Sequence, residues 1–236
     1  PVPIDAPCYS EDETLADQEI TRLQADEKLT ALRLYKNKSL GSEGLSQLPT
    51  RLTTLVIWSN PHVNDSIIPH LPRGLTFLNL ASSTLTEQCI ESLPPDLLVL
   101  DLSGCNLLDT AIPLLPRGLK TLNMRSNTRL TNSGMAHLPM ALERLNLFSN
   151  GSISDEAIIH LPRTLQVLNF YTNRILTDKG MLALPPNLTE LWLSSNPNIS
   201  SKSIPLLPRS ILLLALSATN KLDAFCLPSM PPFLTR

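Results

Sequence analysis

The dipeptide Leu-Pro returns along this chain at a nearly constant spacing, and this repetition constrains the fold more than any other feature. Successive copies lie 20 to 23 residues apart. Because proline interrupts helix interiors and central strands, it has to lie at a regular boundary of each unit. A period of this length is typical of solenoids and related arrays. The leucines of the nine copies are Leu48, Leu71, Leu93, Leu115, Leu138, Leu161, Leu184, Leu207 and Leu227.

The first half of each unit predicts a short strand. Apolar residues return four, seven and nine positions after the Leu-Pro leucine, as in Leu142, Leu145 and Leu147. Leu-x-Leu alternation is typical of a strand that is buried on one face. A small or polar residue, most often asparagine, follows twelve positions after the same leucine. An additional unit at 29–37 lacks the leading Leu-Pro, so we expect about nine units.

The second half of each unit predicts a short helix. Most units place a helix N-cap residue type, such as Thr131 or Ser154, seven residues before the next Leu-Pro. An apolar residue follows four positions after this cap in eight units. One or two turns of α or 3₁₀ helix, anchored by that side chain and ended by the proline, fit this pattern.

The combined pattern LxxLxLxxN followed by a variable arm resembles the leucine-rich repeats over about 200 of the 236 residues. The segments at 101–112 and 176–185 are similar to the cysteine-containing class of F-box substrate receptors and some bacterial effectors. The Leu-Pro-x-x-Leu opening is also similar to FNIP-type repeats and to those of bacterial ubiquitin-ligase effectors. The resemblance implies an α/β solenoid with parallel strands on the concave face and short helices or 3₁₀ turns on the convex face.

The ends of such a stack need covers, because each repeat buries its leucines only against its neighbours. Residues 10–24 begin with Ser10 and place acids in the first turn, which predicts a capping helix. Phe225, Leu227, Phe233 and Leu234 are the candidate cover at the other end. We therefore expect an N-terminal extension with a capping helix at 1–24, the solenoid at 25–226 and a C-terminal cap or truncated repeat at 227–236.

Charge and cysteine content narrow the class of partner and the compartment. The net charge of −2 and the pI near 6.1 give no overall basic field for nucleic acid or an anionic membrane. No apolar stretch approaches the roughly 18 residues that membrane insertion requires. The four cysteines form no CxxC pair, which favours a reducing, cytoplasmic location. Since the first residue is proline, we expect the natural N-terminus to lie upstream; the oligomeric state is not predicted.

Motifs of catalysis and cofactor binding are missing from the sequence. Gly-rich phosphate loops, GxSxG and HExxH do not occur, so we expect no enzyme, no cofactor and no metal. His70, His137 and His160 share one position before Leu-Pro, but a zinc site needs further ligands. Four arginines that follow Leu-Pro are interpreted as a solvated row: Arg73, Arg117, Arg163 and Arg209.

The recurring asparagine of LxxLxLxxN has a structural and a functional interpretation. A row of amides offers a ligand site, but such side chains also satisfy backbone groups of a buried turn, and we favour that role. Cys105 occupies the same position and is interpreted as a buried substitute rather than a nucleophile.

Side chains that point outward from the strands are the candidate binding residues. Six of the chain's ten aromatic residues, including both tryptophans, fall at these positions. Strand propensity alone is the alternative explanation, but exposed Trp, Tyr and Arg dominate binding hot spots. The predicted concave site comprises Tyr35, Trp58, Phe77, Asp101, Arg125, Arg144, Phe148, Tyr171 and Trp192.

The residues from Arg125 to Trp192 form the densest part of this site, and Tyr35, Trp58 and Phe77 form a second cluster. Nine strands about 4.8 Å apart span roughly 40 Å, which suits a protein or peptide partner. The narrower hypothesis is substrate recognition for a ubiquitin ligase or an effector. Two alternatives stay open. One is a targeting domain of a larger enzyme, and the other is a secreted glycan or cell-surface ligand-binding protein that uses Asn79, Asp101, Asn123, Asn146 and Asn169.

Overall fold

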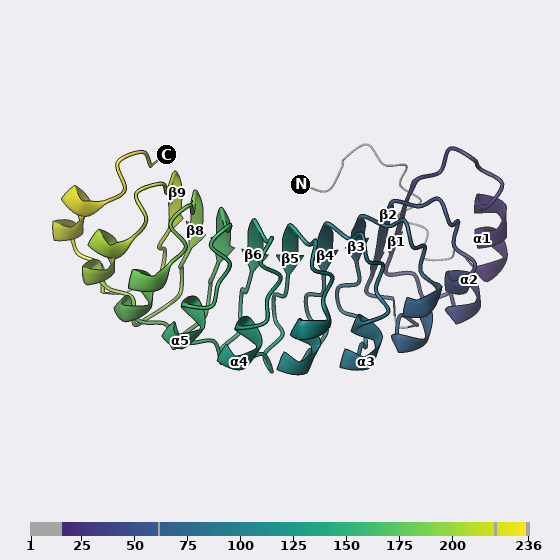
Figure 1. Cartoon of the computed structure of the whole chain (residues 1–236), viewed down its shortest axis with the longest axis horizontal. Coiled ribbons are helices and arrows are strands. Elements are labelled where there is room, and N and C mark those ends of the chain that lie inside the picture. Colours follow the sequence, from purple (N-terminus) through teal and green to yellow (C-terminus); the bar gives the residue numbers. More distant parts are fainter. Residues whose placement is uncertain (1–15, 61, 220, 235–236) are drawn as a thin grey trace.

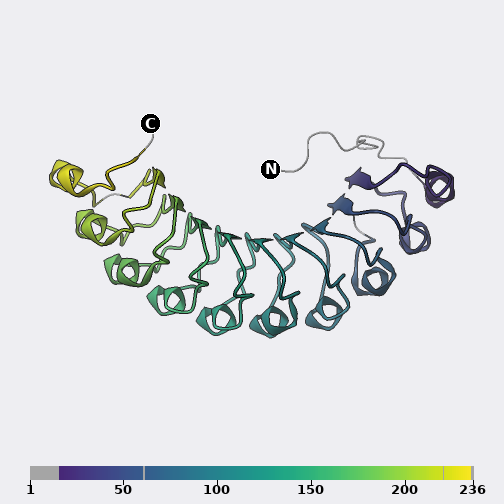
Figure 2. The ribbon, with the colours of Figure 1, turned by 45° about the horizontal axis from the view of Figure 1, so that its top comes forward.

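Nine repeats stack side by side into a curved ribbon in the computed structural model (Figure 1). The structure describes residues 16–60, 62–219 and 221–234. Nine parallel strands pair in chain order in a single sheet. Figure 2 shows the strands lining the inner side of the arc and the helices forming its outer side. The predicted architecture of concave strands and convex helices is confirmed.

Each repeat contributes one short strand in the same register as its neighbours. The middle leucines pair across the sheet, so that Leu78 lies beside Leu100 and Leu122 beside Leu145. The strands are β1 (Ala31–Tyr35), β2 (Thr54–Trp58), β3 (Phe77–Asn79), β4 (Val99–Asp101), β5 (Thr121–Asn123), β6 (Arg144–Asn146), β7 (Val167–Asn169), β8 (Glu190–Trp192) and β9 (Leu213–Ala215).

The convex side carries both α and 3₁₀ helices. Proline lies inside four of the 3₁₀ helices, for example Pro69 and Pro113. The helices are α1 (Asp17–Leu23), α2 (Ser42–Ser46), η1 (Asp65–His70), α3 (Glu87–Ile90), η2 (Asp109–Leu114), α4 (Asn132–Met135), α5 (Asp155–Ile158), η3 (Asp178–Ala183), η4 (Ser201–Leu206) and η5 (Ala224–Ser229).

The core is a column of leucines between the sheet and the helices. Leu78, Leu100 and Leu122 are completely buried, and Leu145 is 2 % exposed. Phe170 replaces one of the recurring leucines and is also completely buried. The alternation of the Leu-x-Leu segment therefore separates buried side chains from the outward ones that form the concave surface.

The N-terminal end of the stack is covered by α1. Its Ile20 and Leu23 are buried in the common core, and the helix packs against α2. The helix begins at Asp17, with Ala16 extended as its N-cap and the Glu19 carboxylate accepting from the Ala16 N–H at 3.1 Å. It thus begins later than expected, and the predicted cap residue Ser10 lies outside the described residues.

The C-terminal end of the stack is less completely covered. Leu214 of β9 is half-buried, unlike its counterparts in the inner strands. Met230 and Leu234 pack against the core, whereas Leu227 and Phe233 are 64 % and 69 % exposed. The side chain of Phe225 lies outside the described part of the chain. Of the expected covering residues, Leu234 therefore contacts the core, and Leu227 and Phe233 project outward.

Neighbouring helices are joined by a hydrogen-bonded pair that the sequence analysis did not predict. The Asp155 carboxylate at the start of α5 accepts from the backbone N–H of Thr177 at 2.8 Å and from its hydroxyl. Asp65, Asp109 and Asp178 make the same pair of bonds to the cap residue of the following repeat. We call these pairs the aspartate latches.

A latch variant tests this arrangement. We expect Asp155→Ala to lower the free energy of unfolding by about 1–2 kcal/mol, because Thr177 loses a cap partner. Asp155→Asn should cost much less, since Asn132 already bonds Ser154 in the same way. Urea unfolding of both variants provides the measurement. Equal losses for Ala and Asn would contradict the hydrogen-bonding role.

Candidate functional site

The outward side chains of the sheet form three rows across the concave face. Row 1 takes the first residue of β3 to β9, and row 2 takes the third. Row 3 lies two residues further on, at Arg125, Phe148 and Tyr171 for the central repeats. These row 3 residues follow the strands and do not belong to them. Trp58, in contrast, is still inside the longer strand β2.

An asparagine or aspartate in row 2 ends each central strand. The Oδ1 atom of Asn146 accepts from the Phe148 N–H at 2.9 Å, and that of Asn169 accepts from the Tyr171 N–H at 2.9 Å. Asn79, Asp101 and Asn123 make the same turn. Because the backbone N–H only donates, each amide has to face it with its oxygen, and its NH₂ group therefore points away from the turn.

Three row 3 side chains from consecutive repeats stack on one another. The rings of Phe148 and Tyr171 are nearly parallel, with centroids 4.8 Å apart and an interplanar angle of 14°. The guanidinium carbon of Arg125 lies 4.4 Å from the centroid of the Phe148 ring. Phe148 and Tyr171 remain partly exposed. The stack is therefore a rigid platform with a cation at one end.

Arg144 and Trp192 belong to a separate hollow beside this platform. A cavity of 280 Å³ is lined by both side chains and by Val167, Asn146 and Asn169. Trp192 is 36 % exposed and lies beside Asn169 in the sheet. The predicted dense cluster thus divides into the row 3 stack and this hollow, which we call the Arg144 cavity.

The predicted second cluster is divided as well. Phe77 and Asp101 line a cavity of 290 Å³ that also reaches Arg144. Trp58 instead lines a different cavity of 290 Å³ together with Arg125. Phe77 lies one strand from Trp58, whereas Arg125 follows β5, three strands from it. The side chain of Tyr35 lies outside the described residues. Residues therefore share a cavity according to the row that they occupy on the sheet, and not because their repeats are adjacent in the chain.

The recurring asparagines have the structural role that the sequence analysis favoured. The Asn127 side chain is completely buried and donates to the carbonyls of Leu102 and Met124 at 2.9 and 3.0 Å. Its oxygen accepts from the Leu107 N–H at 3.0 Å. Cys105 is also buried, and its thiol donates to the Leu80 carbonyl at 3.3 Å. The interpretation of Cys105 as a buried substitute is confirmed.

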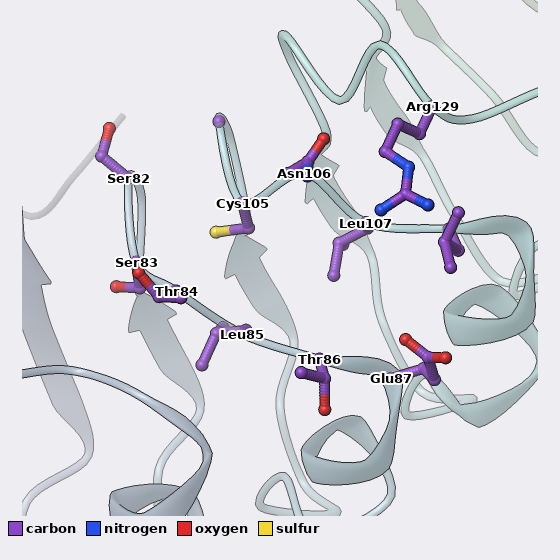
Figure 3. A pocket seen from close by; sticks show the side chains of 12 residues that line it. Ser82, Ser83, Thr84, Leu85, Thr86, Glu87, Cys105, Asn106, Leu107 and Arg129 are labelled. Atoms are coloured by element: carbon purple, nitrogen blue, oxygen red, sulfur yellow. The ribbon is translucent and has the colours of Figure 1, made fainter.

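A third kind of hollow lies on the flank, where two neighbouring repeats lack the asparagine. Ser83 and Cys105 occupy that position, and a cavity of 430 Å³ opens beside them. Figure 3 shows Glu87 and Arg129 at its other side, with the Cys105 sulfur turned toward the serines. The Ser83 hydroxyl is buried and has no hydrogen-bond partner within the described part of the chain. Burial raises the pKa of the Cys105 thiol to about 11, so this thiol is not activated as a nucleophile.

The raised thiol pKa values predict a loss of stability at alkaline pH. Burial and the adjacent Asp65 carboxylate raise the pKa of Cys89 to about 12. In the unfolded chain both thiols ionise near pH 9, whereas in the folded protein they stay protonated to higher pH. Their contribution to stability is therefore fully present below pH 9. The free energy of unfolding should therefore fall as pH rises from about 9 toward 11–12. The Cys89→Ala, Cys105→Ala double variant should lose part of this slope; an unchanged slope in urea titrations would contradict the assignment.

The arginine row has a more specific role than the solvated surface we expected. Arg73, Arg117 and Arg163 donate to carbonyls at or just beyond the helix end of the following repeat, Ser92, His137 and Ala183, at 2.9–3.1 Å. Arg209 makes the equivalent bond to Ser229 at 3.1 Å. Arginine near a helix end satisfies carbonyls that lack a partner within the helix. The recurrence of arginine after Leu-Pro was visible in the sequence, but its hydrogen bonds to carbonyls of the following repeat were not predicted.

The described part of the chain has neither a metal-binding cluster nor a membrane-spanning helix. Within residues 16–60, 62–219 and 221–234, no three His, Cys, Asp or Glu side chains are grouped so as to hold a metal ion. His70, His137 and His160 are all exposed. No helix in the same part of the chain has both the length and the apolar character needed to cross a membrane. Cys89, Cys105 and Cys226 are free thiols, and Cys8 lies outside the described residues.

Comparisons with known proteins identify the fold. No protein-family model and no curated protein matches the sequence. A chain of the yeast Rad7 and Elc1 complex aligns with a TM-score of 0.72 and 17 % identity, covering 96 % of this chain and 65 % of that one. An internalin of Listeria monocytogenes aligns with a TM-score of 0.70 and 22 % identity, covering 92 % and 62 %.

The chain thus spans somewhat less than two thirds of the length of either neighbour. Both neighbours are leucine-rich-repeat proteins, and at these identities the likeness concerns the fold. The single sheet of nine parallel strands, the buried leucine column and the asparagine-bonded turns agree with it. The chain is a leucine-rich-repeat solenoid.

Proposed function

We propose that this solenoid is a protein-interaction module that binds a protein or peptide partner on its concave face. The observation that carries the proposal is the Arg125–Phe148–Tyr171 stack beside the Arg144 cavity. Folding does not require aromatic rings and arginines on this face, because the leucine column already supplies the core. Rigid aromatic area next to a cation is what interface hot spots commonly contain.

The dimensions of the face support a macromolecular partner. The cavities along it are shallow hollows of 280–290 Å³ that adjoin one another across β3 to β8. Small-molecule sites are usually closed clefts that bury most of a ligand. Repeated shallow hollows along a sheet instead suit the successive side chains of an extended segment. We assign no enzymatic activity to the described residues, and nucleic acid and membranes are not among the proposed partners.

Substitutions on the two faces test the proposal. A peptide is selected on the wild-type chain from a displayed random library, and its affinity is then measured for variants. We expect Trp192→Ala and Tyr171→Ala to weaken binding by roughly 30-fold or more, which is the size of a hot-spot loss. Thermal midpoints should change little for Trp192→Ala, because the side chain is partly exposed.

The matched control is Ile159→Ala on the convex side, where the side chain is 63 % exposed. This variant should leave the affinity unchanged. The proposed concave site would be wrong if no selected peptide responds to either aromatic substitution, or if the Ile159 variant weakens binding equally.

We propose more narrowly that the bound partner is a substrate presented to a ubiquitin ligase or an effector machinery. The support is the similarity of the repeats to those of F-box receptors and bacterial effectors, together with the Rad7 and Elc1 complex among the structural neighbours. The reading frame that flanks Pro1 and Arg236 is the test. An F-box or ligase domain beside the repeats is expected, and an unrelated catalytic domain would favour the targeting-domain alternative.

A further inference from the structure

We infer that the Arg144 cavity recognises the carboxylate of an aspartate or glutamate side chain in an extended peptide segment of the partner. The inference rests on the proposed concave binding site and names the chemistry of its ligand. It depends on three donor groups that line one hollow and have no acceptor among the described residues: the Arg144 guanidinium and the NH₂ groups of Asn146 and Asn169.

The two asparagines are fixed as donors by the backbone. Each Oδ1 atom accepts from a backbone N–H at 2.9 Å, so each Nδ2 is turned away from the turn. Asn146 and Asn169 are neighbours in register on β6 and β7, about 4.8 Å apart as strands in a sheet are. Among the described residues, neither Nδ2 atom has a hydrogen-bond acceptor.

The same row shows what these NH₂ groups bind when an acceptor is present. One strand earlier, the Nδ2 atom of Asn123 donates to the Asp101 Oδ2 atom at 2.8 Å. The chain therefore already contains one carboxylate held by a row 2 amide. Asn146 lies between Asn123 and Asn169 in row 2, and Asn169 lies between Asn146 and Trp192. Among the described residues, no carboxylate is therefore the row 2 neighbour of either amide.

The charge of the cavity is complementary to an acid. Arg144 is exposed and forms no ion pair with any described residue. Asp101 on β4 and Glu190 on β8 are the acidic residues of the three rows, and neither lines the cavity. A guanidinium and two amide donors around one hollow provide the charge-assisted hydrogen bonds that a carboxylate accepts. Trp192 and Val167 supply the apolar wall against which the ligand's methylene groups would pack.

The probe is a phage-displayed random peptide library selected on the whole chain. The peptides are fused at their C-terminus, so a selected acid has to be a side chain. We expect Asp or Glu to be enriched at one position of the selected peptides. A synthetic peptide with blocked ends should bind roughly 10- to 100-fold more tightly than its Glu→Gln or Asp→Asn counterpart, as for hydrogen bonds to a charged group.

The protein variants keep the turn and remove the donor. Asn146→Asp and Asn169→Asp retain the oxygen that accepts from the backbone, since Asp101 makes the same turn to Ser103 at 2.9 Å. Each should fold normally and weaken the acidic peptide roughly 10- to 100-fold while affecting the neutral peptide far less. Arg144→Gln should act in the same direction. Asn187→Asp, at an exposed position away from the sheet, is the charge-matched control and should have little effect.

The outcomes separate this inference from the proposed function. Selected peptides that need Trp192 and Tyr171 but show no acidic position would overturn the carboxylate site and leave the concave binding face intact. Equal binding of the acidic and neutral peptides, or unchanged binding by both aspartate variants, would also overturn it. A failure to select any peptide that depends on the concave face would overturn the proposed function as well.

Discussion

Replacing Asn127 by leucine should lower the free energy of unfolding by about 3–5 kcal/mol, because three buried backbone groups lose their partner at once. The side chain donates to the carbonyls of Leu102 and Met124 and accepts from the N–H of Leu107. Leucine has a similar volume but offers no hydrogen bond. Urea unfolding monitored by circular dichroism measures the loss.

The sequence itself provides the control for this substitution. Cys105 occupies the equivalent position and still donates its thiol to the Leu80 carbonyl. Asn127→Cys should therefore be less destabilising than Asn127→Leu, since one of the lost bonds is replaced. A leucine variant within about 1 kcal/mol of the wild type would show that the turn does not depend on this amide.

Replacing Leu145 by alanine is the second large effect, with an expected loss of about 3 kcal/mol. Leu145 is 2 % exposed and lies between Leu122 and Leu168 in the sheet. Truncation leaves a cavity in the middle of the stack, where repeats on both sides lose contacts. Stability in a solenoid depends on such neighbour contacts, so a central defect weakens two interfaces.

The end of the stack supplies the comparison. Leu214 is the corresponding residue of β9, but it is only half-buried because no further strand pairs with β9 among the described residues. Leu214→Ala should cost roughly half as much as Leu145→Ala, in line with its smaller buried area. Equal losses for the two variants, measured in the same urea series, would contradict burial by neighbouring repeats.

Much of the fold could be predicted because the same pattern of apolar residues, asparagine and proline recurs in each repeat. The spacing of Leu142, Leu145 and Leu147 fixes a strand and its buried face, and the proline of the next Leu-Pro fixes where the helix ends. Repetition also made the asparagine position recognisable as structural. A single copy of this pattern would have left strand and turn assignments open.

Features that depend on contacts between repeats were harder to predict. The aspartate latches need Asp155 and Thr177, which are 22 residues apart, to meet across an interface. The Arg163 guanidinium likewise donates to the Ala183 carbonyl, which is 20 residues away. Each partner alone looks like an ordinary polar surface residue. An alignment of the repeats in register would have placed each residue beside its partner in the next repeat.

The grouping of residues in the candidate site also depends on contacts between repeats and could not be predicted from the sequence. Sequence reasoning selected the outward aromatic and arginine residues, but it grouped Trp58 with Phe77 by their closeness in the chain. In the structure, the two line different cavities because they occupy different rows of the sheet. The freedom of the Asn146 and Asn169 NH₂ groups depends on which backbone N–H each oxygen accepts. No residue type alone reveals that geometry.

The accessibility of Trp192 during complex formation tests the central proposal most directly. The chain has two tryptophans, so Trp58→Phe leaves Trp192 as the sole indole reporter. Iodide quenching of its fluorescence is measured with and without a saturating peptide selected on the wild-type chain. Binding on the concave face predicts that the peptide strongly reduces quenching. Full occupancy, shown by fluorescence polarisation of the labelled peptide, with unchanged quenching would contradict the proposal.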